Sequence, residues 1–328
     1  MQSFRSLRPT TNPYIAMLDA ALAAEPTIEH LHWSWPAALI GRVEAYHFHW
    51  PETLLEGDRA WKRIVRRSMM RALLLKIRMT RAAIVRTAHN VEIPRDVDPP
   101  TRRLLERIEA LTTHRIVLNE TTEVTGPCTV ILHGHYRNWF APHERADVVP
   151  GRVAYFGLIR RYKGVESLLE AYRAASERDP ALSLEIGGRP SSADLAELVT
   201  AAATSLRSVT TTLRFLDDAE LVRIATSAQV VVLPYRFMHN SGSALAALSL
   251  DRPVLVPRNE VNARLAAEVG AGWVLPFDGE LDADDLGEAL ARERPSGRPD
   301  LSRREWKDAG RMHAAAFHRA IADARGAR

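Results

Sequence analysis

The sequence contains one cysteine, Cys128, among its 328 residues. This excludes an intramolecular disulfide framework and a cysteine-rich zinc or iron–sulfur site, and it favours a reducing compartment. No run of 18 apolar residues occurs, and the first residues, MQSFRSLRPTT, lack the apolar core of a signal peptide. We therefore expect neither a transmembrane helix nor export by the secretory route.

Two nucleotide-binding motifs are also missing. The Gly-x4-Gly-Lys spacing of a Walker loop does not occur, which disfavours an NTPase. No Gly-x-Gly-x-x-Gly follows any predicted strand, which disfavours a nicotinamide enzyme.

What the sequence does contain is an alternation of short apolar runs with helical stretches, which predicts an α/β protein with parallel sheets. The length is about twice that of an average domain, so we expect two domains. In the first half the expected strands are IEHLHWSW, VEAYHFHW, AAIVRTAHN, RIVLN and CTVILHG, with helices near 13–24, 59–80 and 99–111. In the second half they are VAYFGLI, LSLEIGG, TTTLRFL, VVVLPY, PVLVP and GWVLPF, with helices near 164–177, 191–206, 218–227, 242–249, 260–269 and 302–325.

The expected domain boundary is APHERADVVPG, residues 141–151, which is polar and holds two prolines and a glycine. It predicts a first domain over 1–145 and a second over 151–328, with the last helix free to pack back on the first. Two open sheets joined in this way would face a cleft. Because open α/β sheets bind ligands beyond the carboxyl ends of their strands, the chemistry is expected just after each strand.

Positive charge is concentrated in the first half. Residues 1–150 hold 20 Lys and Arg against 16 Asp and Glu, and 59–86 holds ten basic residues and no acidic one. The segment predicts an amphipathic helix with Trp61, Ile64, Val65 and Met69 on one side. The expected membrane-binding residues are Arg63, Arg66, Arg67 and Arg71, because basic amphipathic helices lie on anionic membranes. A merely solvated basic face is the alternative, and nucleic acid is disfavoured because no recognised binding motif accompanies the charge.

Most histidines of the first half lie at strand ends. HFHWPE (47–52) and HGHYRNWF (133–140) each carry two histidines two residues apart, which places both on the same side of a strand. Zinc bound by such pairs with Glu52 is one interpretation. The other is hydrogen bonding to substrate hydroxyls or backbone, which the lack of a second carboxylate at ligand spacing favours. We therefore expect no metal site.

One polar group at these strand ends can act as a general base. The candidates are Glu52, His89, His49 and His135, with Glu52 preferred because it follows a strand end and a proline. His89, in TAHN (87–90), can instead cap the next segment. Trp50 and Trp139 are expected either to stack on a sugar ring or to belong to the core.

Two helix starts in the second half are suited to anions. FGLIRRYKG (156–164) places Arg160, Arg161 and Lys163 between a strand and a helix. HNSGSALAALS (239–249) begins another helix with small residues that expose backbone amides. Because helix N-termini attract anions, the pair predicts a diphosphate site, with solvated surface charge as the alternative for the first segment.

The ordered set of motifs resembles a known family. FGLIRRYKGVESLLEAY, LEIGGRP and VVVLPYRFMHNSGSALAALSLDRPVLVP resemble the donor half of GT-B glycosyltransferases, and HFHWPE and TAHN are similar to strand ends of the acceptor half. With RPTTNPY and HGHYRNWF, the likeness over about 10–300 is to bacterial GDP-mannose:glycolipid 4-β-mannosyltransferases. It implies two Rossmann-like domains facing a central cleft. It also implies transfer of mannose to a lipid-linked or polysaccharide-precursor acceptor at the cytoplasmic face of the membrane.

The resemblance also implies roles for single residues. Arg160 and Lys163 match cations that neutralise the donor diphosphate, and His89 matches a histidine near the transferred sugar. The full expected donor-binding set is Arg160, Lys163, Arg189, Asn240, Ser241, Gly242 and Ser243. Protein cations then stabilise the leaving diphosphate, so neither a cofactor nor a metal is expected beside the nucleotide sugar.

Two departures from the family pattern bear on mechanism. Many retaining members carry Glu-x7-Glu, but Ala246 stands at the second glutamate position, which favours inversion. The usual Gly-Gly loop after the first strand is replaced by RPTTNPY. A retaining transferase or a nucleotide-sugar epimerase of the same architecture stays an alternative, and a non-catalytic membrane- or nucleic-acid-binding protein is the alternative of another class.

Overall fold

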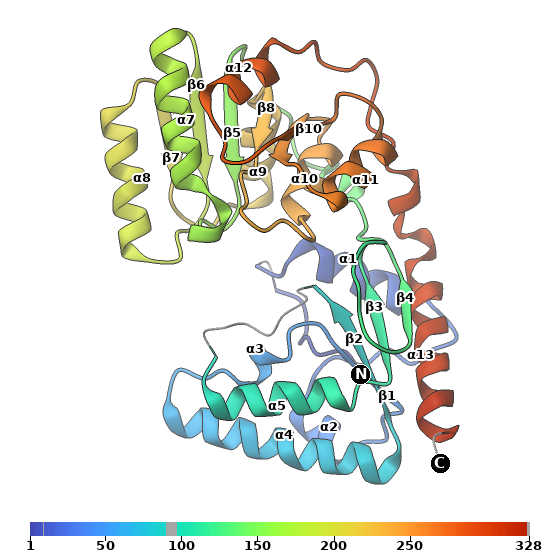
Figure 1. Cartoon of the computed structure of the whole chain (residues 1–328). Helices are drawn as coiled ribbons and strands as arrows, with labels where there is room; N and C mark the ends of the chain where they lie inside the picture. The colour runs from blue at the N-terminus through green and yellow to red at the C-terminus, as the bar shows by residue number, and fades with distance from the viewer. Residues whose placement is uncertain (9, 90–96, 327–328) are drawn as a thin grey trace. The chain divides into compact units, whose positions relative to one another are not determined.

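The computed structural model describes residues 1–8, 10–89 and 97–326, which form two compact α/β units (Figure 1). The first unit comprises Met1–Gly134 and Glu305–Arg328, and the second comprises His135–Arg304. Each unit contains one sheet whose strands all pair in parallel. The predicted α/β class with two parallel sheets is therefore confirmed.

The sheet of the first unit has the order β1–β2–β3–β4. Its strands are β1 (Ala45–Phe48), β2 (Ala83–Ala88), β3 (His114–Val117) and β4 (Cys128–Val130). The helices are α1 (Pro13–Ala23), α2 (Trp35–Ile40), α3 (Glu52–Leu55), α4 (Ala60–Thr80), α5 (Pro99–Ala110) and α13 (Ala309–Gly326), the last preceded by the 3-10 turn η3 (Trp306–Asp308). Asn12 and Asp98 cap α1 and α5 through their side chains, and a proline follows each as the first helical residue.

The N-terminal residues extend this sheet beyond β1. The Ser3 amide donates to the carbonyl of His47 over 2.9 Å, while Gln2, facing the other way, donates to the carbonyl of Leu31 over 2.8 Å. Residues 31–33 and β1 therefore flank the N-terminal segment on opposite sides. The prediction of a strand at IEHLHWSW (28–35) is wrong: this stretch hydrogen-bonds to the short N-terminal segment but forms no regular strand.

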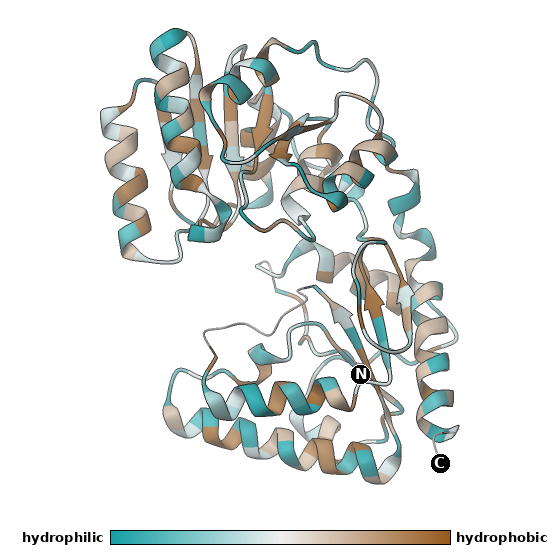
Figure 2. Cartoon of the chain, in the orientation of Figure 1, coloured by the Kyte–Doolittle hydropathy of each residue, from teal (hydrophilic) through white to brown (hydrophobic). Residues whose placement is uncertain are grey.

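A hydrophobic core joins the sheet of the first unit to its helices. Tyr46 and Phe48 of β1 and Ile84 of β2 are fully buried against apolar side chains of α4 and α5. α13 packs against α1, β1, β2 and β3, so the last helix belongs to the first unit. Figure 2 shows teal and brown residues alternating along α4 and α5, and a brown, apolar carboxyl end of β3.

The sheet of the second unit has the order β10–β9–β8–β5–β6–β7. Its strands are β5 (Arg152–Phe156), β6 (Ser183–Gly187), β7 (Val209–Thr212), β8 (Val230–Val232), β9 (Val254–Pro257) and β10 (Val274–Phe277). Its helices are α6 (Arg137–Phe140), α7 (Val165–Arg178), α8 (Ala193–Ser205), α9 (Asp218–Ser227), α10 (Gly242–Ser249), α11 (Glu260–Val269) and α12 (Ala283–Ala291), with 3-10 turns η1 (Arg161–Lys163) and η2 (Ser302–Arg304). The strand order reverses between β5 and β8, which makes their carboxyl ends the switch point where such sheets bind ligands.

The second unit begins earlier than the expected linker at 141–151. The Tyr136 amide donates to the Ser249 hydroxyl over 2.8 Å, and the Ala146 amide donates to the Thr226 hydroxyl over 2.9 Å. These bonds attach 135–149 to α9 and α10, so the polar stretch that composition suggested as a linker is part of the second unit.

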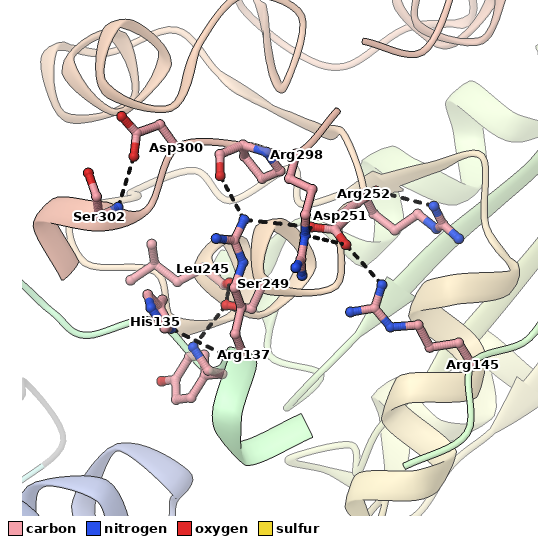
Figure 3. Close-up of polar contacts among 12 residues, drawn as sticks. His135, Arg137, Arg145, Leu245, Ser249, Asp251, Arg252, Arg298, Asp300 and Ser302 are labelled. Carbon is pink, nitrogen blue, oxygen red and sulfur yellow. Dashed lines mark hydrogen bonds and ion pairs between the residues drawn. The ribbon is translucent and has the colours of Figure 1, made fainter. Parts of the chain in front are cut away.

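Asp251, just after α10, fixes the same segment by charge (Figure 3). Its carboxylate accepts hydrogen bonds from Arg145 and Arg298 over 2.9 and 3.0 Å, and Arg137 lies 3.6 Å away. Burial raises the pKa of Asp251, but the hydrogen bonds and charges of Arg298 and Arg145 outweigh burial and hold the pKa below its usual value. The carboxylate therefore holds three arginines from the two ends of the unit.

Candidate functional site

The candidate site of the second unit lies at the switch point between β5 and β8. After β5 the chain turns at Gly157, whose φ is +117°, and reaches Gly164, whose φ is +68°, at the start of α7. A Cβ atom on Gly157 would lie 3.2 Å from the Ser243 hydroxyl oxygen and 3.7 Å from the Lys163 Nζ. The loop after β5 and the start of α10 therefore converge, as the predicted diphosphate site requires.

Lys163 is held in place at this point. Its Nζ donates to the Tyr235 hydroxyl over 3.2 Å and lies 4.7 Å from the centre of the Tyr235 ring, a cation–π contact. Arg161 is paired with Glu166 at 3.5 Å. By contrast, the exposed side chain of Arg160 has no hydrogen-bond or ion-pair partner among the described residues. Arg160 and Lys163 therefore present cationic charge that no carboxylate of the described chain neutralises.

The start of α10 presents free backbone amides. The Ser241 hydroxyl accepts a hydrogen bond from the Ala244 amide over 3.1 Å and so caps the helix. Gly242 and Ser243 occupy the first helical positions, whose amides have no acceptor within the helix. The predicted helix start at 242 is confirmed, and it has the geometry of an anion site.

The other expected donor-binding residues lie on loops of the same unit. Arg189 is exposed just after β6, where Gly188 has a φ of +146°. Asn240 is half-buried before the start of α10. The sequence motifs did not indicate His239, which precedes Asn240. Burial lowers the pKa of His239.

His135 is not where the sequence predicted it. The strand β4 ends at Val130, so the expected pairing of His133 and His135 on one strand is wrong. His133 belongs to the first unit, whereas His135 is buried in the second, where its Nδ1 accepts a hydrogen bond from the Arg137 amide over 3.2 Å (Figure 3). Because the chain leaves the sheet between them, His135 drops out as a base supplied by the first unit.

In the first unit, the ends of β1 and β2 carry a cluster of rings. The ring centres of His47 and His49 are 4.3 Å apart, which confirms that both point to one side of β1. The His49 Nδ1 lies 3.0 Å from the His89 Nε2, and the His47 Nε2 lies 2.7 Å from the hydroxyl oxygen of Thr87. Trp50 stacks on His89 with ring centres 4.1 Å apart. The ends of the two strands thus bring together His47, His49, His89 and Trp50.

Two further members of the cluster were missed. Tyr14, in the first turn of α1, lies 5.3 Å from His89 and 4.6 Å from His133 between ring centres. It belongs to RPTTNPY, a motif that contributed to the family resemblance but did not indicate this residue. His313, on α13, lies 5.8 Å from His47, and nothing in the sequence links the two.

Burial sets the protonation of these imidazoles. Burial lowers the pKa of His47 and of His89 well below the ordinary value. It lowers the pKa of His49 to about 3 and that of His313 to about 4. For His47, His49 and His89, the charge of nearby imidazoles lowers the pKa further. All four are therefore neutral near pH 7. They can exchange hydrogen bonds with hydroxyl groups, but a pKa of about 3 makes His49 a weak general base.

Glu52 lies at the same strand ends. It is the first residue of α3, is half-buried, and follows Trp50 and a proline. Arg86 of β2 is within electrostatic reach: burial lowers the pKa of Arg86, and the charge of Glu52 raises it. The Glu52 carboxylate therefore lies near β2, the strand that His89 follows. Asn90, the last residue of TAHN, lies outside the described residues.

One group of side chains in the first unit is spaced closely enough to hold a metal ion. Among the described residues, the group of three whose possible ligand atoms lie within 4.8 Å of one another is Asp19, His30 and His32. The Asp19 carboxylate accepts from the Nε2 atoms of His30 and His32 over 2.5 and 2.7 Å. Burial raises the pKa of Asp19, but the hydrogen bonds from His30 and His32 outweigh burial and hold the pKa below its usual value. These two hydrogen bonds hold the group together.

Helix α4 forms as predicted, but three of its four expected membrane-binding arginines are half-buried. Arg63 donates to the carbonyl of Gly57 over 3.2 Å, Arg67 pairs with Asp98, and Arg66 lines a pocket. Arg71 is exposed. The large apolar side chains that α4 exposes are Trp61, Ile64, Val65, Leu75 and Met79. No described helix is both long and apolar enough to cross a membrane.

Comparison with known proteins places the chain in a family of glycosyltransferases. Residues 150–292 match the family model of group 1 glycosyl transferases. The chain is 42% identical over 307 residues, 92% of its length and 87% of the relative's, to a GDP-mannose:glycolipid 4-beta-D-mannosyltransferase of Xanthomonas campestris pv. campestris.

Solved structures show the same architecture. HepE from Anabaena, in complex with UDP, matches with a TM-score of 0.60 at 11% identity, covering 96% of this chain and 94% of that one. Sucrose-phosphate synthase from Thermosynechococcus elongatus matches with a TM-score of 0.56 at 16% identity, covering 99% and 96%. At these identities the structures establish the fold, GT-B, which agrees with the resemblance seen in the sequence.

Proposed function

Because this chain belongs to the group 1 glycosyltransferases and has the GT-B fold, we propose that it transfers mannose from GDP-mannose to a glycolipid acceptor. The observation that carries the proposal is the 42% identity to a relative of that activity, which extends over 92% of the chain. The two candidate half-sites support it, because each lies at strand ends in its own unit.

The second unit would hold the donor. Arg160, Lys163 and the amides at the start of α10 supply positive charge where Gly157 lets a ligand approach the backbone. In the transfer, the bond between the anomeric carbon and the diphosphate oxygen breaks and GDP leaves. The cations stabilise the negative charge that develops on that oxygen. In this proposal the protein charges replace a divalent metal, so transfer should persist in EDTA.

The first unit would supply the general base. As the acceptor oxygen attacks the anomeric carbon from the face opposite GDP, its proton passes to a side chain. We assign this role to Glu52, because the buried histidines have pKa values too low for efficient proton abstraction near pH 7. His89 would then bind the sugar hydroxyls. A single base on the opposite face inverts the anomeric configuration.

The exposed face of α4 would bind the membrane that contains the acceptor. Ile64, Leu75 and Met79 are 61%, 60% and 75% exposed, and Arg71 and Arg78 are exposed on the same helix. Apolar side chains with basic residues beside them insert into the interface of an anionic bilayer. The protein would thus be peripheral, on the cytoplasmic face, with the exposed apolar residues of α4 in the lipid and the half-buried arginines outside it.

A nucleotide screen tests the donor. We expect GDP to raise the unfolding temperature more than UDP or ADP, since a ligand at a hundredfold its Kd adds about 2.7 kcal/mol of stability. Radiolabelled mannose should pass from GDP-mannose into the lipid extract of bacterial membranes. Stabilisation by UDP alone, or label that stays in the aqueous phase with active protein, would overturn the proposed reaction.

A further inference from the structure

Three side chains with metal-binding atoms converge in the first unit, outside the cluster of rings at the ends of β1 and β2. They are Asp19 on α1 and two histidines, His30 and His32, on the stretch that pairs with the N-terminal segment. The same carboxylate oxygen of Asp19 accepts hydrogen bonds from both Nε2 atoms, over 2.5 and 2.7 Å. A tetrahedral zinc ion with bonds of about 2.1 Å would spread its ligand atoms to about 3.4 Å. A small rotation of each side chain therefore accommodates the ion.

The fold holds these ligands in position. Leu18, next to Asp19, is fully buried in the core and anchors α1. His30 and His32 lie two residues apart, and both imidazoles face Asp19, with their ring centres 5.1 Å apart. The backbone of this stretch is hydrogen-bonded to residues 2–4 over 2.8 Å at two places. Sequence patterns did not indicate the site, because Asp19 reaches the two histidines only through the packing of α1.

The donor atoms select the kind of ion. Two imidazole nitrogens and one carboxylate oxygen suit Zn²⁺, whereas Mg²⁺ and Ca²⁺ prefer oxygen ligands alone. Three protein ligands leave the fourth position of a tetrahedral ion for water. The His32 side chain is 40% exposed, while those of His30 and Asp19 are 9% and 14% exposed, so the group opens to solvent on the His32 side. Zinc and its water can therefore enter and leave the folded unit.

We propose that Asp19, His30 and His32 bind an exchangeable zinc ion that stabilises the first unit. Because the ligands meet only when α1 packs beside residues 28–33, zinc binds the folded unit in preference to the unfolded chain. The ring centre of Phe4 lies 6.0 Å from that of His32 and 5.8 Å from that of His49. The ion would thus steady a segment that borders the cluster of rings, while taking no part in the chemistry of transfer.

Zinc titration of the purified, untagged chain after treatment with EDTA tests the proposal. We expect a single tight Zn²⁺ site, measured by competition with a chromophoric chelator, and a zinc-dependent rise in the unfolding temperature. Asp19→Asn, His30→Gln and His32→Gln should each weaken zinc binding at least tenfold, since loss even of a residue that only orients a ligand costs about 10–100-fold. His143→Gln, which changes a half-buried histidine of the second unit, is the matched control and should bind zinc like wild type.

His32→Gln keeps the test decisive even if Asp19→Asn destabilises α1, because His32 is exposed. Equal zinc affinity in wild type and in all three ligand variants would overturn the assignment, and so would the lack of any zinc binding. Stabilisation by Mg²⁺ equal to that by Zn²⁺ would contradict an imidazole site. Removal of zinc should leave transfer unchanged at a temperature at which the chain stays folded. Loss of transfer under that condition would contradict a purely stabilising ion.

Discussion

The Nδ1 atom of His49 and the Nε2 atom of His89 lie 3.0 Å apart, so one ring donates a hydrogen bond and the other accepts it. Burial lowers the pKa of both imidazoles, which keeps the pair neutral. A neutral, hydrogen-bonded pair fixes the orientation of each ring. This arrangement suits positioning of a sugar better than removal of its proton, and it directs attention to Glu52 as the base.

Glu52→Gln should abolish most transfer without weakening donor binding. Loss of a general base lowers turnover by roughly two to four orders of magnitude. The readouts are turnover under saturating acceptor and GDP-dependent thermal stabilisation, which should be unchanged.

The control for this experiment is His89→Ala, which should raise KM for the acceptor more than it lowers turnover. Near-normal turnover in Glu52→Gln together with loss in His89→Ala would make the histidine the base. The anomeric configuration of the product, measured by NMR, decides between inversion and retention. A retained configuration would contradict a mechanism with one inverting base.

Arg160→Ala and Lys163→Ala should each reduce transfer at least tenfold, which corresponds to about 1.4 kcal/mol in the transition state. Each removes a cation that stabilises the leaving diphosphate, so thermal stabilisation by GDP should also fall. Arg161→Ala is the matched control, because Arg161 is already paired with Glu166. Full activity in both Arg160→Ala and Lys163→Ala would remove the diphosphate assignment.

Replacing Ile64, Leu75 and Met79 by serine should release the protein from anionic vesicles. We expect partitioning in a sedimentation assay to fall at least tenfold, because burying each such side chain contributes about 1.5–3 kcal/mol. Charge reversal at Arg71 or Arg78 should each weaken the free energy of membrane binding by about 1 kcal/mol. High salt should also weaken binding, because it screens the attraction to anionic lipids. Leu198→Ser, an exposed leucine of the second unit, is the control. Unchanged binding of the triple variant would show that α4 is not the membrane face.

The buried histidines should make the protein less stable in mild acid. Burial lowers the pKa of His313 to about 4, below the ordinary 6.5, so between these values the unfolded chain binds a proton that the folded chain does not. Stability is therefore fully present above pH 6.5 and falls as the pH drops toward 4. This one group contributes a loss of about 2 kcal/mol at pH 5.

Urea unfolding at pH 7.5 and pH 5 measures this effect. In His313→Gln the loss between the two pH values should be smaller by about 2 kcal/mol. His318→Gln is the control, because His318 is exposed on the same helix. An equal loss in wild type and His313→Gln would contradict the buried, neutral imidazole.

The sequence by itself determined most of the elements and the positions of the candidate donor loops. Nearly every strand and long helix follows from apolar runs and their spacing, and α9, α10 and α11 begin and end at the predicted residues. The reason is local: capping side chains such as Ser241 and Asp217 act within one helical turn. The loops after β5 and β8 could be predicted as candidate ligand sites, because a parallel sheet binds ligands beyond the carboxyl ends of its strands.

Only the tertiary structure decided which residues meet. Composition predicted a boundary at 141–151, but Asp251 and its arginines fix that stretch to the second unit. Periodicity separated the apolar and basic sides of α4, yet it did not show that Arg63 and Arg67 find partners in the unit while Ile64 is exposed. His313 reaches His47 only because α13 packs back on the first sheet. Such contacts depend on the packing of distant segments, which local sequence patterns do not encode.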